Sequence, residues 1–430
     1  MSKIFHPFLF LIFLVISASV CAQISSTTSD FKVSTAYSPH DSIFIFNQGA
    51  TAKMGTLKAF AKGGIPATFT WSAYDTVNHV FSAPFQTDAN ALSSVATNLN
   101  QGGYKVQVTR AGLDTTMFAW VFLNSMSFSV EKNNAGEVHF YRRTCEYTNL
   151  QANAVPSGFT YFNVVNKARH TLNNTVNIKW TANPSNNVQL GDGAKIWIEG
   201  DDLPTEDTEY TAQATDNFNL SKEDKVKYIS IIPKADFETD YKKKYSDSVA
   251  SAPVTVNFTN NSKNAVKYTW IFGDGDTTIL STPSNTPEPH IYYFTAKDGK
   301  DYKIKLIAES KEKCVREDTA TITVNKPELD APNFFTPGGS DSFNEKFVIR
   351  NVSMREFHLT IFTRSGRKVY EFHGPDINSW EGWNGQLNGN GPDLSAGIYY
   401  YVLHAISWEQ PGKKYPPVEW SKFVYLIRNK

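Results

Sequence analysis

The segment Val266–Gly275, with the sequence VKYTWIFGDG, joins an alternating strand to a glycine turn, and it decides the fold class that we expect. Trp270 and Phe272 lie two residues apart, so in a β-strand both side chains point to the same face. The glycines on either side of Asp274 supply the backbone freedom of a tight turn, and the Asp274 carboxylate can accept backbone N–H groups there. The pattern predicts a strand with one buried aromatic face that ends in a turn.

Strand tryptophans recur along the chain at Trp71, Trp180 and Trp270, spaced by roughly a domain length. Sandwich domains commonly bury one such aromatic residue between their two sheets. Alternating segments that read as further strands follow each of them, at Tyr104–Thr109, Lys227–Ile231 and Tyr302–Ile307. No segment shows a long apolar period near 3.6, so the predicted class is all-β, with tandem immunoglobulin-like β-sandwich domains.

The whole chain carries 42 Lys plus Arg and 42 Asp plus Glu among 430 residues, so it has no formal net charge. This balance gives no indication of nucleic acid or an anionic membrane as a partner. The length suits about three or four domains, each large enough to bury a core.

The N-terminus has the layout of an export signal. Lys3 precedes an apolar run at Phe8–Ile16, and small residues follow up to Ala22. The run is shorter than the roughly 20 residues that span a bilayer, which disfavours the alternative of a membrane anchor. We therefore expect a signal peptide over residues 1–22, cleaved after Ala22. Cys21 could instead mark a lipoprotein site, but the bulky Val20 before it argues against that processing.

Only Cys145 and Cys314 remain after this cleavage, and they fall in different expected domains. Small secreted folds that depend on disulfides contain many more cysteines. We therefore expect both residues to be buried apolar filler, with no disulfide between them.

The segment Val266–Gly275 belongs to a longer motif. Downstream of it come Pro289-His290-Ile291-Tyr292 and an alternating strand that begins near Tyr302. Together these resemble the polycystic-kidney-disease (PKD) domain, with its W-x-F-G-D-G, P-x-H-x-Y and G-x-Y-x-V-x-L patterns, over residues 234–326. The resemblance implies a spacer or interaction module in which the motif residues are structural: Trp270, Phe272, Gly273, Asp274, Gly275, His290, Tyr292 and Tyr302.

The same motif contains possible metal ligands in Asp274, Asp276 and His290. Calcium takes six to eight oxygen ligands, often from several carboxylates, and only two carboxylates are present here. The structural role is therefore the favoured one, and we expect neither a metal nor a cofactor.

The last hundred residues contain the strongest motif set. A P-N-F-F-T-P segment opens it, an L-T-I-F-T-R-S-G-R-K-V-Y-E hairpin follows, and W-E-G-W, G-I-Y-Y-Y and L-I-R segments complete it. The order resembles the gliding-motility-associated C-terminal domain, the type B sorting domain of the type IX secretion system of Bacteroidetes. The matching positions are Asn333, Phe335, Thr336, Pro337, Phe362, Arg364, Gly366, Trp380, Gly382, Gly397, Tyr399, Tyr400 and Arg428.

Two departures from the family pattern matter. Residues 338–342, GGSDS, replace an acidic N-G-D-G loop, which puts any calcium-like role of that loop in doubt. Ser365 stands where the family has Trp. The resemblance implies a small β-sandwich that is recognised in the periplasm by the type IX secretion machinery, and hence a final location outside the cell or on its surface. Within it, we expect Tyr399–Tyr401 to alternate between core and surface, and a β-branched residue at Gly397 to unfold the domain.

No His-Glu-x-x-His, Gly-x-Ser-x-Gly or phosphate-loop motif occurs. The leading hypothesis is a non-enzymatic surface or secreted protein whose modules act as spacers and bind an unknown protein or glycan. The alternative is a degradative enzyme, acting on glycan or protein, with an unrecognised site in residues 31–232. The expected layout is a signal peptide at 1–22, immunoglobulin-like domains at 23–130 and 131–233, a PKD domain at 234–326 and a sorting domain at 327–430.

Overall fold

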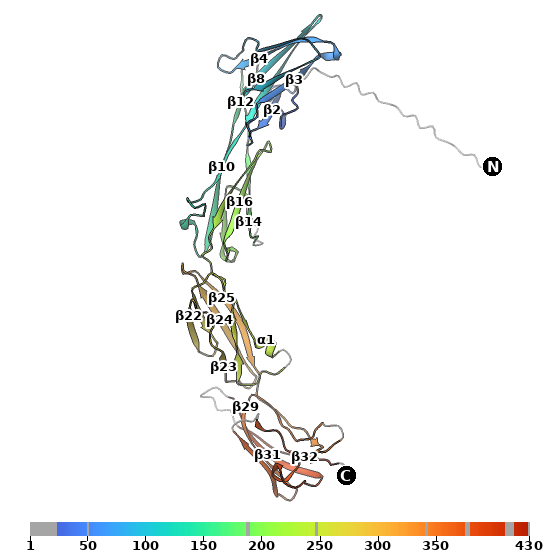
Figure 1. Cartoon of the computed structure of the whole chain (residues 1–430), viewed down its shortest axis with the longest axis vertical. Helices are drawn as coiled ribbons and strands as arrows, with labels where there is room; N and C mark the ends of the chain where they lie inside the picture. The colour runs from blue at the N-terminus through green and yellow to red at the C-terminus, as the bar shows by residue number, and fades with distance from the viewer. Residues whose placement is uncertain are drawn as a thin grey trace, which may run out of the picture. The chain divides into compact units, whose positions relative to one another are not determined.

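A computed structural model describes residues 24–49, 51–185, 190–245, 248–339, 343–374, 379–408 and 417–428. The expected signal peptide and its cleavage position at Ala22 lie outside these residues. The chain forms two compact units, one reaching Leu203 and including Asp207–Ile229, the other made of Pro204–Glu206 and Ser230–Lys430. Figure 1 shows strands throughout both units, and α1 (Tyr241–Lys244) is the only α-helix in the described part of the chain. The predicted all-β class is confirmed. No described helix has the length and apolar character needed to cross a membrane.

The first sandwich, β1–β9, packs a large sheet against a small one. Trp71 is fully buried between the sheets, and its indole N–H donates to Ser94 Oγ at 2.8 Å. Burying about 200 Å² of aromatic surface favours folding by about 5 kcal/mol. The large sheet has the order β1 (Phe31–Ser34), β2 (Ser42–Asn47), β9 (Leu113–Asn124), β8 (Gly102–Arg110), β4 (Ala67–Asp75) and β5 (Val80–Phe81), with β6 (Gln86–Ala91) also on β4; the small sheet pairs β3 (Gly55–Phe60) with β7 (Ser93–Leu99).

The large sheet of the first sandwich is covered on both faces. The hairpin of β12 (Phe159–Phe162) and β13 (Arg169–Leu172) places Phe159 and Tyr161 in one core cluster with Ile43 and Trp120. This cover explains why Ile43–Phe46 in β2 are buried without interruption, where a half-covered sheet would show alternation.

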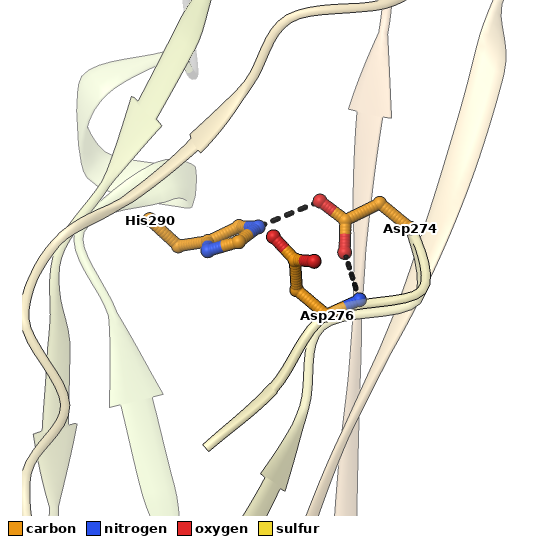
Figure 2. A group of neighbouring side chains, drawn as sticks. All are labelled: Asp274, Asp276 and His290. Carbon is orange, nitrogen blue, oxygen red and sulfur yellow. Dashed lines mark hydrogen bonds and ion pairs between the residues drawn. The ribbon is translucent and has the colours of Figure 1, made fainter.

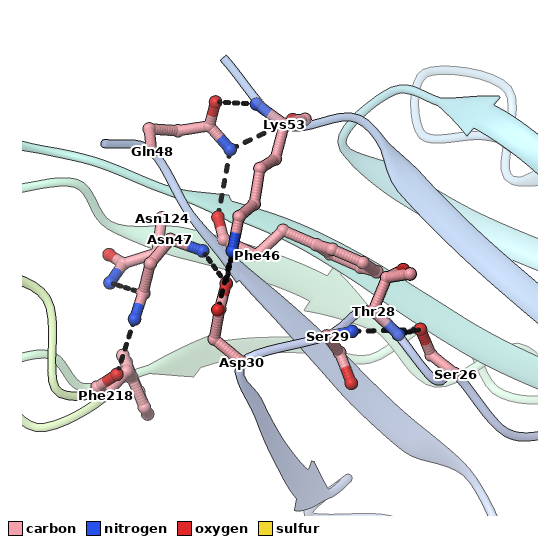
Figure 3. Close-up of polar contacts among 10 residues, drawn as sticks. All are labelled: Ser26, Thr28, Ser29, Asp30, Phe46, Asn47, Gln48, Lys53, Asn124 and Phe218. Atoms are coloured by element: carbon pink, nitrogen blue, oxygen red, sulfur yellow. Dashed lines mark hydrogen bonds and ion pairs between the residues drawn. The ribbon is translucent and has the colours of Figure 1, made fainter. Parts of the chain in front are cut away.

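A buried polar cluster joins the first sandwich to the strands that follow it. Asn47 Nδ2 donates to the backbone oxygen of Phe218 at 2.8 Å, and Asn124 Nδ2 donates to Asn47 Oδ1 at 2.9 Å (Figure 3). The carboxylate of Asp216 accepts from Asn124 Nδ2 at 2.6 Å and from the backbone N–H of Phe218 and Leu220. These bonds satisfy polar groups that would be costly to bury alone, so they fix how the two sets of strands meet.

The second sandwich, β10–β17, has two three-stranded sheets with Trp180 buried between them. The indole N–H of Trp180 donates to the backbone oxygen of Gly193 at 2.9 Å. One sheet has the order β10 (Met126–Val130), β11 (Tyr147–Pro156) and β15 (Lys195–Glu199); the other has β14 (Val176–Asn183), β16 (Thr208–Asp216) and β17 (Ser221–Tyr228).

Two expectations for this region are wrong. The strand that we expected at Lys227–Ile231 is β17, which starts at Ser221 and ends at Tyr228. Its first half has polar side chains that face solvent, so it lacks an apolar pattern, but its backbone pairs with β16. Cys145 and Cys314 are both disulfide-bonded, so they are not the free thiols that we expected. The position of a cysteine in the sequence does not show whether a second sulfur lies within bonding distance of it in the fold.

The third sandwich, β18–β25, contains the segment that decided the fold class. Trp270 and Phe272 are both buried on the same side of the strand, as predicted. The main sheet has the order β22 (Thr277–Ser281), β21 (Lys267–Ile271), β24 (Lys300–Glu309) and β25 (Val315–Val324); opposite it, β18 (Phe237–Thr239) pairs with β20 (Phe258–Asn260) and β19 (Val254–Val256) with β23 (His290–Tyr292).

The terminal domain, β26–β32, is built on a five-stranded sheet whose inner face forms a separate core. The predicted hairpin around the Arg-Ser-Gly turn is formed by β29 and β30. The sheet has the order β27 (Phe334–Phe335), β32 (Val418–Leu426), β31 (Gly397–Ser407), β29 (Met354–Phe362) and β30 (Lys368–Gly374), and β26 (Glu328–Asp330) pairs with β28 (Arg350–Val352).

Candidate functional site

The turn after β21 brings together the three polar side chains that the sequence singled out. His290 Nε2 lies 2.7 Å from Asp274 Oδ2, and the backbone N–H of Asp276 donates to Asp274 Oδ1 at 3.0 Å (Figure 2). The His290 ring stacks flat on Phe272, with the ring centroids 4.0 Å apart. Asp274 therefore ties its own turn to strand β23 on the opposite sheet.

The glycine before Asp274 is required by the packing. Gly273 has a φ of +85°, and a Cβ there would lie 2.5 Å from the backbone oxygen of Lys303. This close approach lets the turn lie against β24. Gly275 also has a positive φ, of +114°, but a Cβ there meets nothing within 4 Å. Glycine is therefore required at position 273 because a side chain would clash with β24, and it is favoured at position 275 because of the backbone conformation there.

Two motif tyrosines lie beneath the turn. Tyr292 is buried and its hydroxyl donates to the backbone oxygen of Phe272 at 3.2 Å, while Tyr302 Oη donates to the backbone oxygen of Phe294 at 2.7 Å. Burial, followed by the negative charge of Asp274, raises the pKa of the Tyr302 hydroxyl to about 12 and that of Tyr292 well above its usual value. Both hydroxyls stay neutral and act as hydrogen-bond donors.

The three side chains also form a group that could hold a cation, since one ligand atom from each lies within 4.8 Å of the others. However, both oxygens of Asp274 already accept hydrogen bonds within the protein. The donor set offers one imidazole and two carboxylates, which does not fit the six to eight oxygens that calcium prefers. The contacts of the group are those of a clamp that closes a turn.

We predict that Asp274→Asn weakens the third sandwich. Burial alone would raise the pKa of the Asp274 carboxyl, but hydrogen bonds from His290 and from the Asp276 backbone outweigh burial and hold that pKa below its usual value. A carboxyl whose pKa is lowered by folding stabilises the fold above its unfolded pKa of about 3.9 and loses this contribution as the pH falls through the folded value. At pH 7 the variant should lose about 1.5–3 kcal/mol, the usual value of hydrogen bonds to a charged group.

The measurement is hydrogen exchange in a urea series, followed on peptides from β21 and β24, which report on this sandwich alone. The difference between the two proteins should begin to shrink below about pH 4 and should disappear once the pH falls below the lowered pKa of the folded Asp274 carboxyl, where the wild-type group is also protonated. Asp276→Asn is the control, because its side chain is exposed and only its backbone N–H contacts Asp274. Equal stability of Asp274→Asn and wild type at pH 7 would contradict the clamp.

The motif residues of the terminal domain divide between core, turns and surface. Phe335 is fully buried, Trp380 and Tyr399 are more than 90% buried, and Tyr400 is 44% exposed on the other face. The expected alternation of Tyr399–Tyr401 is confirmed, with Tyr401 in the core.

Trp380 Nε1 donates to Tyr370 Oη at 2.8 Å. Of the remaining motif positions, Phe362 ends β29, Arg364 and Gly366 lie in the turn between β29 and β30, and Pro337 lies in the loop after β27.

The first and last segments of this motif set lie side by side. The backbone N–H of Tyr425 donates to the backbone oxygen of Asn333 at 2.8 Å, and that of Ile427 donates to Phe335 at 3.0 Å. Thr336 closes its own loop through a backbone bond to Asn344 at 2.7 Å. The parallel pairing of β27 with β32 therefore closes the domain with residues from both of its ends.

Arg428 fixes the end of this domain to its central loops. Its Nε donates to the backbone oxygen of Leu394 at 3.1 Å, and its Nη2 donates to that of Gly385 at 3.2 Å. The same Nη2 forms an ion pair with Asp393 at 3.1 Å. The planar guanidinium can make these bonds together, which a lysine could not do.

The family comparison bears on this domain. Residues 329–420 match the model of the CHU_C type IX secretion signal domain. A secretion signal of this kind indicates export of the chain out of the cell. Asn333, Phe335, Trp380, Gly397 and Tyr399 all lie inside the matched range, whereas Arg428 lies beyond its end.

Comparison with other known proteins adds architectural neighbours. No curated protein sequence matches the chain. Similar solved structures include a tetra-tandem repeat from the extending region of a large adhesion protein, with 13% identity and a TM-score of 0.26, covering 90% of this chain and 99% of that chain. They also include titin domains I67–I69, with 12% identity and a TM-score of 0.31, covering 66% of this chain and 95% of that chain.

Sequence reasoning missed the junction between the third sandwich and the CHU_C domain. Ser353 is fully buried with a φ of +52°, and its Oγ donates to the backbone oxygen of Asn325 at 2.7 Å. The backbone N–H of Ala252 donates to Ser353 Oγ at 3.1 Å, and that of Thr295 donates to the backbone oxygen of Trp408 at 3.2 Å. A lone serine between two strands gives no sequence signal of such a role.

Proposed function

We propose that this chain is an exported, non-enzymatic protein of the cell surface or the surrounding medium. The observation that supports the proposal best is the match of residues 329–420 to a type IX secretion signal domain. In this proposal, the chain crosses the inner membrane by its signal peptide and reaches the periplasm. There the type IX machinery recognises the folded CHU_C domain and passes the chain across the outer membrane.

The remaining domains act in this proposal as spacers and binding modules. We infer that residues 234–326 are a PKD domain, because Trp270, Asp274 and His290 have the contacts that a structural motif needs. The tandem sandwiches would then offer their exposed faces to a ligand. Their ligand is a protein or a glycan.

The surface that the machinery contacts is proposed to be the outer face of β31 and β32. Tyr400 lies directly opposite Phe423, and Ile398 lies opposite Tyr425. Each of these four side chains is 36–47% exposed. An apolar surface of this kind is unusual on a soluble domain and commonly marks a binding surface. Since the domain is the export signal, its occupant is proposed to be a component of the type IX machinery.

A reporter fusion tests this proposal. A signal peptide followed by a fluorescent protein and residues 327–430 is expected to reach the surface or the medium of a host with type IX secretion. The same fusion with Tyr400→Ser and Phe423→Ser should stay in the periplasm, because both changes remove apolar contact area without touching the core. Ile279→Ser in the full-length protein serves as the control, since Ile279 is 62% exposed on the third sandwich. Retention of the unmodified fusion in the periplasm would refute the assignment of the signal.

A further inference from the structure

One outer sheet face of the second sandwich exposes a tryptophan that its core does not need. In β15, Ile196 and Ile198 point inward and are buried, while Trp197 points outward and is 51% exposed. The sandwich already has Trp180 in its core. Trp197 lies directly opposite Asn149 of β11, and its ring centroid is 5.2 Å from that of Tyr147. The Lys195 ammonium lies over the indole, 4.7 Å from the ring centroid, so the indole offers a flat apolar platform once this flexible side chain moves aside.

Polar side chains held in fixed positions adjoin this platform. Arg142, from the short turn Phe140–Arg142, donates to Asn149 Oδ1 at 3.2 Å and to Gln151 Oε1 at 3.4 Å, and it forms an ion pair with Glu131. The side chain of Arg142 is 16% exposed and that of Glu131 is 29% exposed. The amides are thus oriented before any ligand arrives, which lowers the entropy cost of binding.

The charges of this face limit what can bind to it. Arg142 and Lys195 are cationic, and Glu131 and Glu199 are anionic, so the face has no net charge. A nucleic acid or an acidic lipid surface would require an excess of cations. A neutral ligand that combines an apolar face with many hydroxyl groups fits better. A sugar ring has such a structure, because its C–H face can stack on an indole while its hydroxyls bond to amides, carboxylates and guanidinium groups.

We propose that the outer face of the β10–β11–β15 sheet binds an uncharged glycan, with a sugar ring stacked on Trp197 and its hydroxyls bound by Gln151 and Arg142, which the buried Asn149 helps to hold in place. The proposal rests on the function proposed above, because it names the ligand class of one binding module. Tyr141, on the same turn as Arg142, is 59% exposed and offers a further aromatic ring.

Isothermal titration calorimetry on the mature chain tests the site, with cellohexaose, xylohexaose, mannohexaose and laminarihexaose as probes. We expect at least one of them to bind with a Kd in the micromolar to millimolar range. Trp197→Ala should weaken that binding by roughly tenfold or more, and Trp197→Tyr should restore part of it. Gln151→Ala should also weaken it. Phe60→Ala, which removes an exposed aromatic of the first sandwich, should leave it unchanged.

Several outcomes would overturn the inference. One is that none of the four probes binds, and another is that Trp197→Ala binds as well as wild type while its circular dichroism is unaltered. Binding only to heparin, with a strong salt dependence, would point to an anionic ligand instead. Cell fractionation of the wild-type and Trp197→Ala proteins measures export separately from glycan binding. If no probe binds but the chain is exported, only the glycan inference fails. If the wild-type chain is not exported, the proposed function fails.

Discussion

A chain from which residues 333–430 have been deleted is expected to accumulate in the periplasm, with none on the cell surface or in the medium. The deletion removes all but the first few residues of the segment that matches the type IX secretion signal domain. It also removes all five strands of the terminal sheet. The readout is immunoblotting of periplasm, outer surface and medium, compared with the full-length chain.

The three sandwiches should stay folded in this truncated chain. The core of the third sandwich consists of residues between Phe237 and Val324, and among the described residues Trp408 is the only hydrophobic residue of the deleted segment that packs against it. The truncation removes Ser353 and thus one hydrogen-bond partner of Ala252. In the truncated chain this junction is open to water, so solvent can replace the lost hydrogen bonds. The third sandwich should therefore lose only about 1–2 kcal/mol in its free energy of unfolding.

Hydrogen exchange on β21, β24 and β25 checks this second expectation. Protection close to that of the full-length chain would mean that retention in the periplasm reflects a missing signal and not a misfolded protein. A truncated chain that reaches the surface or medium at the normal level would contradict the assignment of the signal. Loss of protection in these strands would mean that the truncated chain is misfolded, and it would contradict the independence of the third core from the terminal domain.

The sequence could predict the parts of this fold that depend on alternation along a single strand. Trp71, Trp180 and Trp270 were expected in cores, and each is buried with its indole N–H bonded inside its own sandwich. Such features depend on residue type and on the alternation of side chains along a strand, and both can be read directly from the sequence. The resemblance to the PKD domain implied structural roles for Asp274 and His290, but it did not predict the contact between them.

The features that sequence reasoning missed depend on which strands meet. The indole of Trp197 could equally have faced inward, because only the pairing of β15 with β11 decides its side. The hairpin of β12 and β13 packs on the first sandwich although it lies far along the chain, so its contacts could not be predicted. The uninterrupted apolar run Ile43–Phe46 did indicate a strand that is buried on both faces. The disulfide-bonded state of Cys145 likewise depends on distances that no local pattern contains.

Substituting Gly382 by alanine is expected to unfold the terminal domain and to abolish export with it. Gly382 has a φ of +94°, and a Cβ there would lie 2.7 Å from Val348 Cγ2 and 2.9 Å from the backbone oxygen of Phe347. That oxygen accepts from the backbone N–H of Trp383 at 3.0 Å, and the Phe347 N–H donates to the Trp383 oxygen at 2.8 Å. The methyl group would force this pair of bonds apart.

The damage would reach the core, because Phe347 and Trp383 are both fully buried in the same cluster. Backbone strain at a positive φ costs about 1–3 kcal/mol, and the displaced aromatic packing adds a similar amount. The sum is comparable to the whole stability of a small domain. We therefore expect little folded terminal domain at 37 °C and almost no protein outside the cell.

Gly397→Ala is the matched control, since both glycines belong to the sorting motif. At Gly397 the φ is +155° and a Cβ would meet nothing within 4 Å, so only the backbone strain remains. The sequence alone suggested that a larger side chain at Gly397 would unfold the domain, whereas the contacts assign the greater steric demand to Gly382. Hydrogen exchange on β29 and β31, together with cell fractionation, should show a severe loss for Gly382→Ala and a mild one for Gly397→Ala. Equal losses would mean that the clash with Phe347 and Val348 does not determine the folding of this domain.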